Sequence, residues 1–246
     1  MSPLEPTVLA ALFAVVIAAQ VVETVAGFGA TVISLAIGVH FVPLEMLVVT
    51  LVLIGLVQSS WLVLRWRMHV RLRLLFTRIL PFCALGLGAG NLVFQHVDAN
   101  FLKSTLGVFV LVFSSWRLWQ LFSGKDPKTL SPMVSAGFLV GGGFFHGMFA
   151  SGGPLVVYYA SRTIDDRHAF RATLSSLWLT LNMALLTSYA LHGQLVRPPV
   201  TLAIALLPAV GVGILVGELV LSRVNEILFR KVVQFLLLGT GICLLF

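Results

Sequence analysis

The chain is a series of long apolar segments separated by short polar stretches. Apolar residues dominate segments such as Pro43–Leu64 and Gln194–Leu221. A helix needs roughly 20 apolar residues to cross about 30 Å of hydrocarbon. The pattern therefore predicts an all-α polytopic membrane protein. Ordinary membrane spans are expected near residues 44–64, 75–95, 102–122, 170–191, 200–221 and 227–246.

Two further apolar segments, Val8–Val42 and Met133–Ala160, are longer than one span and are interrupted by polar residues and glycines. The second is too short for two full spans but long enough for two half-helices that meet near mid-depth. We therefore expect a broken, re-entrant helix hairpin at the start of each half of the chain. The interruptions are Glu23 with Gly27 and Gly29 in the first segment, and His146 with Ser151–Pro154 in the second.

The two halves of the chain repeat one another weakly but in the same order. Pro81-x4-Gly86-x3-Gly90 recurs as Pro208-x4-Gly213-x3-Gly217 after 127 residues, and Gly27–Ala30 pairs with Ser151–Pro154 after about 124. Repeats of this kind are typical of transporters. We predict a first membrane repeat at 1–122, a cytoplasmic linker at 123–132 and a second repeat at 133–246, all in one membrane domain. We interpret the glycines of the two spans as packing positions.

Loop charge distinguishes two topologies. If each opening segment crosses the membrane once, the chain has eight spans and its 16 Lys and Arg residues divide nine to seven. If each opening segment turns back, only Lys103 and Arg197 lie on one side and 14 lie on the other. The positive-inside rule favours the second topology. Three full crossings per half then give the halves opposite orientations, which is an inverted repeat with both termini outside.

Composition and charge limit the partners. Charged residues make up 10% of the chain, against about 25% in soluble domains. The net charge of +7 comes from basic residues in short loops, which predicts contact with anionic membrane lipid rather than nucleic acid. Cys83 and Cys243 lie inside apolar segments without metal-ligand spacing, so we expect no metal and no cofactor.

The glycine-rich interruptions are candidate anion sites. A helix that begins inside the membrane presents free N–H groups and a partial positive charge, which bind anions. Ser151 is a candidate N-cap for such a helix, and Pro154 suits its first turn. Close helix packing through small residues is the alternative. The candidate substrate-binding residues of the two interruptions are Gly27, Phe28, Gly29, Ala30, Thr31, Ser151, Gly152, Gly153 and Pro154.

Several polar residues within the apolar segments are further candidates. Glu23 and His146 occupy similar places in the two halves, and they are candidates for proton coupling because ionisable groups at that depth are costly. Asn182 and Gln58 either line a polar cavity or bond neighbouring helices. Arg171 is either a substrate-gathering cation or a membrane-surface anchor.

In its order of motifs the chain resembles the sulfite exporter TauE/SafE family. The resemblance is carried by Val25–Ala30, Gly147–Pro154 and Phe170–Leu174, with Asn182 following, and it covers nearly the whole chain. Ala30 and Ala150 stand where the family commonly has glycine. The resemblance implies export of sulfite or organosulfonate-type anions across a bacterial inner membrane by a multi-pass protein.

The leading hypothesis is therefore a secondary transporter for a small anion, not an enzyme. Another small anion and the uptake direction stay open, as does a homo-oligomer. A membrane-embedded enzyme built on His146 and Ser151, or an assembly factor, is a weaker alternative. A cytoplasm-negative potential favours anion efflux by roughly 2.3 kcal/mol per charge per 100 mV.

Overall fold

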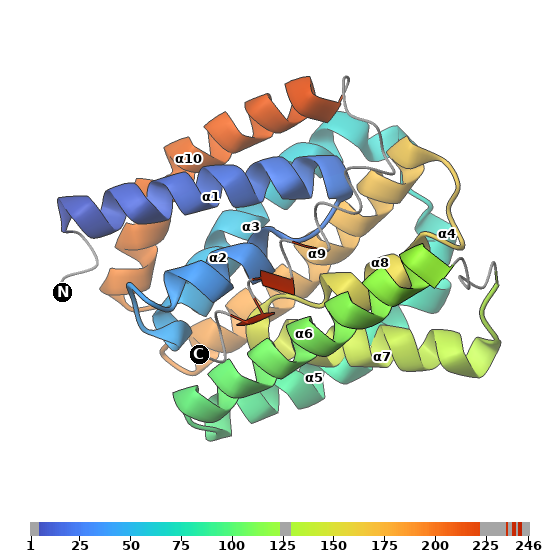
Figure 1. The fold of residues 1–246 in the computed structure, drawn as a ribbon, viewed down its shortest axis with the longest axis horizontal. Helices are drawn as coiled ribbons and strands as arrows, with labels where there is room; N and C mark the ends of the chain where they lie inside the picture. The colour runs from blue at the N-terminus through green and yellow to red at the C-terminus, as the bar shows by residue number, and fades with distance from the viewer. Residues whose placement is uncertain (1–4, 124–128, 222–234, 236–237, 240, 243–246) are drawn as a thin grey trace. The chain divides into compact units, whose positions relative to one another are not determined.

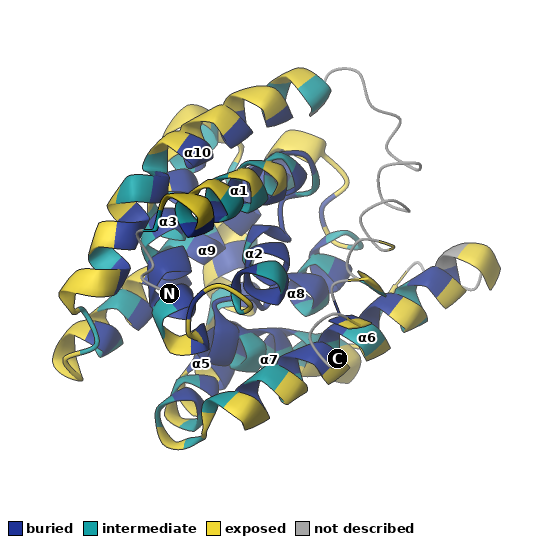
Figure 2. Cartoon of the chain, turned by 60° about the vertical axis from the view of Figure 1, so that its left-hand side comes forward, coloured by how far each residue is buried: buried dark blue, intermediate teal, exposed yellow. Residues whose placement is uncertain are grey.

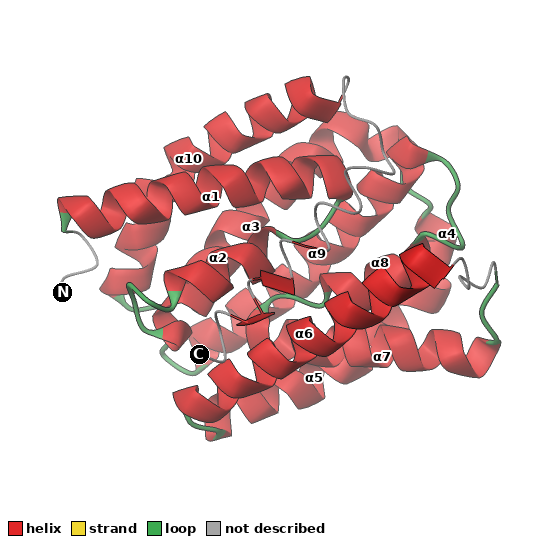
Figure 3. Cartoon of the chain, in the orientation of Figure 1, coloured by secondary structure: helices red, strands yellow, loops and turns green. Residues whose placement is uncertain are grey.

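A computed structural model describes residues 5–123, 129–221, 235, 238–239 and 241–242. The described residues form helices joined by loops and contain no strand (Figure 3). The predicted all-α class is therefore confirmed for this part of the chain. The span expected at 227–246 and the centre of the linker at 123–132 lie largely outside the described residues.

The helices that follow the opening segments agree with the predicted spans to within a few residues at each end. Between the first two of them, the basic stretch forms the short helical turns Arg67–His69, Leu72–Leu74 (α4) and Leu75–Ile79. The long helices are α3 (Leu44–Trp66), α5 (Leu80–His96), α6 (Ala99–Ser123), α9 (Arg167–Leu191) and α10 (Arg197–Leu221).

Each opening segment is a long helix followed by a short one. In the first, α1 (Pro6–Ala26) precedes α2 (Ala30–Gly38). In the second, α7 (Pro132–Phe149) precedes α8 (Gly153–Ala160). At 1.5 Å per residue, α1 is about 31 Å long and α8 about 12 Å. The arms are thus unequal, which corrects the expectation of two half-helices on either side of each break.

Six helices in the described part of the chain, α1 among them, are long and apolar enough to cross a membrane. Large apolar side chains remain exposed on several of them, such as Leu85 on α5 (70%) and Leu215 on α10 (66%). The short helices α2 and α8 are instead mostly buried (Figure 2). Exposed apolar faces suit contact with lipid, and broken backbone at membrane depth requires burial in protein. The chain is therefore a multi-pass membrane protein.

The two breaks have the same backbone plan. The long helix ends on a left-handed residue, Gly27 (φ 81°) or Ala150 (φ 51°). The N–H of that residue donates to the carbonyl oxygen of Glu23 or His146, at 2.7 Å in both breaks. The structural correspondence is therefore a shift of 123 residues, not 124. It pairs Glu23 with His146 and Gly29 with Gly152, and it corrects the sequence pairing by one position.

The structure divides into two compact units, and each takes segments from both halves of the sequence. Unit 1 comprises Met1–Leu47, Val97–Lys128 and Ala205–Phe246. Unit 2 comprises Val48–His96 and Thr129–Ile204. The compact units do not follow the boundary between the predicted membrane repeats at 1–122 and 133–246, and those repeats stay a prediction.

Glycines bring the helices of each unit into close contact. In unit 2, α5 lies along α7 (Figure 1), and a Cβ at Gly86 or Gly90 would overlap the backbone of Val140 or Phe144. In unit 1, a Cβ at Gly213 would lie 2.5 Å from Cβ of Gln20 on α1, and Gly217 faces Thr24 in the same way. The interpretation of these glycines as packing positions is confirmed.

Candidate functional site

In unit 1, the break between α1 and α2 is closed by a carboxylate. Ala30, the first residue of α2, donates its backbone N–H to Oε2 of Glu23 at 2.9 Å. The two residues can meet because Gly27 and Gly29, both at positive φ (81° and 113°), turn the chain back on itself. A negative charge is stabilised at this end of a helix by the free N–H groups and the helix dipole. Glu23 therefore occupies the position where an anion would bind.

In unit 2, an imidazole closes the break between α7 and α8. The N–H of Gly152 donates to Nδ1 of His146 at 3.4 Å, which is a long hydrogen bond. Nε2 of His146 lies 3.1 Å from Oδ1 of Asn182. Because Nδ1 accepts a hydrogen bond, the neutral ring must carry its proton on Nε2, from which it donates a hydrogen bond to Oδ1 of Asn182. The ring also stacks on Trp178 with 5.3 Å between centroids.

The bond from His146 fixes the direction of the Asn182 amide. Since Oδ1 accepts from the imidazole, the NH2 group points away from it, and Nδ2 would lie 2.9 Å from a Cβ placed at Gly55. Gly55 and Gln58 are one turn apart on the same face of α3. Gln58 is 1% exposed, and its Nε2 has no hydrogen-bond partner among the described residues. The amide of Asn182, which bonds the imidazole, therefore faces the side of α3 on which Gln58 lies.

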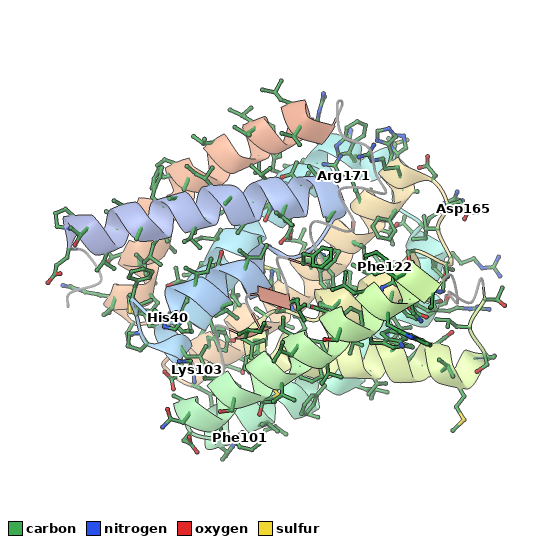
Figure 4. All side chains as sticks on the ribbon, viewed as in Figure 1. His40, Phe101, Lys103, Phe122, Asp165 and Arg171 are labelled. Atoms are coloured by element: carbon green, nitrogen blue, oxygen red, sulfur yellow. The ribbon has the colours of Figure 1, made fainter. Side chains whose placement is uncertain are left out.

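Arg171 is a buried cation in the first part of α9, with 4% of its surface exposed. Figure 4 places it near the start of that helix, after the turn that holds Asp165. It lies seven residues before Trp178, so both face the same side of α9. A guanidinium buried in protein does not face lipid or solvent, and it places positive charge on the face of α9 that carries Trp178.

Some predicted roles are wrong. Ser151 does not cap α8, because the N-cap is Gly152 and no side chain bonds there. The two ring nitrogens of His146 bond Gly152 and Asn182, and no hydrogen bond between His146 and Ser151 is found among the described residues. Gly152 is itself a packing glycine, since a Cβ there would overlap the carbonyl oxygen of Gly142. A valine at this position would test folding rather than binding.

The structure brings the candidates together within each unit. In unit 1, Glu23 meets the stretch from Gly27 to Thr31. In unit 2, His146 meets Gly152 and Asn182, which the sequence had treated separately. Trp178 and Gly55 were missed by sequence reasoning, although their spacings gave a signal. Trp178 lies one turn before Asn182 and Gly55 lies one turn before Gln58, so each pair shares a helix face.

The comparison with protein families gives one match. The family model described as sulfite exporter TauE/SafE matches residues 12–244, which is nearly the whole chain of 246 residues. No match was found among curated proteins or among solved structures.

Proposed function

Because the chain belongs to the sulfite exporter TauE/SafE family, we propose that it is a secondary transporter that exports a small sulfur-containing oxyanion of the sulfite or organosulfonate class. The proposed membrane is the bacterial inner membrane, whose potential favours anion exit. The observation that carries the proposal is the pair of buried helix breaks. In each break, an ionisable side chain, Glu23 or His146, accepts a hydrogen bond from a backbone N–H at the start of the short helix.

Backbone N–H groups are the proposed ligands for the anion at each break. Helix ends contribute about 0.3–2 kcal/mol each, and this modest attraction suits a site that must also release its substrate. In unit 1 the donors belong to Gly29, Ala30 and Thr31, with Phe28 packed beside them. In unit 2 they belong to Gly152, Gly153 and the residue after Pro154, which itself has no N–H. Whether the two breaks converge on one anion stays a prediction.

The proposed architecture is an inverted repeat with two re-entrant hairpins. It rests on the common backbone plan of the two breaks and on the distribution of basic residues in the sequence. The uninterrupted helix α1 is long enough to cross a membrane alone, so the orientation of the termini distinguishes re-entry from full crossing.

Reporter fusions are expected to place the C-terminus outside and the linker at 123–132 inside. The physical reason is that 14 of the 16 basic residues fall on the linker side if the opening segments turn back. A phosphatase reporter and a fluorescent reporter, fused in turn at Phe246 and within the linker, measure this directly. Equal signals at both positions would rule out the re-entrant inverted repeat.

Flux measurement tests the proposed activity. Purified protein in proteoliposomes is expected to move labelled sulfite and methanesulfonate down an imposed concentration gradient, and faster than empty liposomes. Repeating the assay with a pH gradient of either sign measures proton coupling and preferred direction. Absence of flux for both anions, with the protein shown to be folded by its melting curve, would overturn the proposed function.

A further inference from the structure

We infer that the His146 site binds an anion and a proton together, because protonation of His146 both releases the Gly152 N–H and creates a cation that only an anion from outside unit 2 can balance. This inference deepens the proposed function and rests on it. At the break in unit 2, the hydrogen bond between the Gly152 N–H and His146 is replaced by a hydrogen bond from Gly152 to the anion.

The first step concerns the proton position. Nε2 already holds a hydrogen that it shares with Asn182, so a second proton must enter at Nδ1. Nδ1 is the atom that accepts from the Gly152 N–H at 3.4 Å. Two N–H groups cannot face each other without repulsion, so the incoming proton breaks that bond. The Gly152 N–H and the new Nδ1–H then become donors on the same side of the break, where an anion can accept from both.

The second step concerns the lack of an internal counterion. Every residue of unit 2 is described, and the only acids within it are Asp165 and Asp166, in the loop before α9. Asp166 already caps α9 by accepting from the N–H of Ala169 at 2.6 Å. The helical stretches that belong to unit 2 contain no Asp or Glu, and Glu45, at the start of α3, is exposed and belongs to unit 1. A buried imidazolium among them is therefore costly until an anion arrives.

Within unit 2, the other titratable and charged groups of the packed helices do not supply a negative charge. Arg171, on the same face of α9 as Trp178, is a permanent cation and disfavours a second one nearby. The face of Trp178 stabilises a cation but does not neutralise it. The remaining groups on the helices around α7 are Cys83 and His96 on α5, Tyr158 and Tyr159 on α8, Arg167, His168 and Tyr189 on α9, and Arg65 and the exposed Glu45 on α3.

A separate observation indicates that a ligand belongs here. The Nε2 of Gln58 is buried without a hydrogen-bond partner among the described residues. Such a donor costs free energy unless something accepts from it. Gln58 lies one turn from Gly55 on the α3 face that contacts Asn182, and Asn182 bonds His146. A buried donor without an acceptor is the chemistry of an oxyanion site.

The same plan recurs in unit 1 with the opposite charge. Glu23 occupies the position equivalent to His146 and accepts from the Ala30 N–H at 2.9 Å. There, too, protonation weakens the bond to the helix end and removes a charge that would repel an anion. In both breaks, an ionisable side chain thus competes with the substrate for a backbone N–H, and protonation of the side chain frees that N–H.

Proton uptake on anion binding tests the inference. The probe is methanesulfonate, an organosulfonate without a titratable proton near neutral pH, added to the full-length protein in weakly buffered detergent solution with a pH indicator. The wild type is expected to take up protons as the anion binds. His146→Gln keeps an acceptor for Gly152 and a donor for Asn182 but cannot be charged, so its uptake is expected to fall by at least about half a proton per anion, and its affinity by at least about tenfold.

Two further variants distinguish competition between His146 and the anion for the Gly152 N–H from a purely structural role of His146. His146→Ser leaves the Gly152 N–H free, so it is also expected to lose proton uptake but to bind methanesulfonate with an affinity that no longer falls as pH rises. His192→Gln, at an exposed histidine at the end of α9, is the control and is expected to match the wild type. Unchanged uptake in both His146 variants, or an imidazolium already present without anion by NMR, would overturn the inference. Loss of binding in the wild type itself would overturn the proposed function instead.

Discussion

Replacing Gly90 with valine is expected to destabilise unit 2 severely. A Cβ at this position would overlap the carbonyl oxygen of Phe144, which belongs to the α7 backbone and cannot rotate away. Overpacking costs about 1–3 kcal/mol when side chains can adjust, and a rigid backbone raises that cost. At about 2–4 °C per kcal/mol for a chain of this size, we expect the melting temperature to fall by about 10 °C or more.

Gly88→Val is the matched control for this prediction. Gly88 lies on the same helix, two residues before Gly90, and a Cβ placed there would have no atom of the described residues within 4 Å. Valine at this position is expected to leave the melting temperature nearly unchanged. The measurement is a thermal melt of both purified variants in the same detergent. Equal melting temperatures for the two variants would show that α5 and α7 are not in close backbone contact.

Replacing Glu23 with glutamine is expected to tighten anion binding above neutral pH by at least about tenfold. The carboxylate lies at the helix end where the anion is proposed to bind, and two negative charges 4 Å apart repel by about 4 kcal/mol at an effective dielectric constant of 20. Glutamine keeps an oxygen for the Ala30 N–H and removes the charge. Wild-type affinity is expected to weaken as pH rises, because the charged form becomes populated, whereas the variant should lack this component.

Two further variants, Glu23→Ala and Glu45→Gln, serve as controls for this test. Glu23→Ala leaves the Ala30 N–H without its acceptor, so it is expected to lose about 1–3 kcal/mol of stability in addition. Glu45→Gln removes an exposed acid near the start of α3 and is expected to change neither affinity nor stability. Methanesulfonate titrations at several pH values, with melting curves on the same samples, separate the effects. An affinity for Glu23→Gln that equals the wild type at every pH would dissociate Glu23 from the anion site.

The sequence predicted the spans well because a membrane imposes a length on each one. About 20 apolar residues are needed wherever the chain crosses, so α3 and α9 begin and end close to the expected residues. The partners of each helix could not be predicted in the same way. The small-residue face of α5 fits any helix that offers a complementary small face, and the pattern alone does not say that α7 provides it.

The positions of the two helix breaks were predicted from the sequence, but the hydrogen bonds that close them were not. Gly27 and Gly29 are residues that favour left-handed backbone, so the turn after α1 was visible in the sequence. Ala150 gave no such signal, since alanine rarely adopts a positive φ, and the repeat alignment consequently slipped by one residue. Glu23 and His146 were recognised as ionisable groups at depth, but their return to a helix start depends on the turn geometry between them.

Each unit combines helices from both halves of the sequence, and this affects the order in which the protein can be assembled. α1 packs on α10, which follows it by about 170 residues in the sequence, and α5 packs on α7 across the linker. When only the first half of the chain has been synthesised, α1 and α5 are therefore present without α10 and α7, the helices that pack against them. Unit 2 becomes complete near residue 204 and unit 1 only later. A half-length protein should accordingly be a substrate for membrane quality control rather than a smaller transporter.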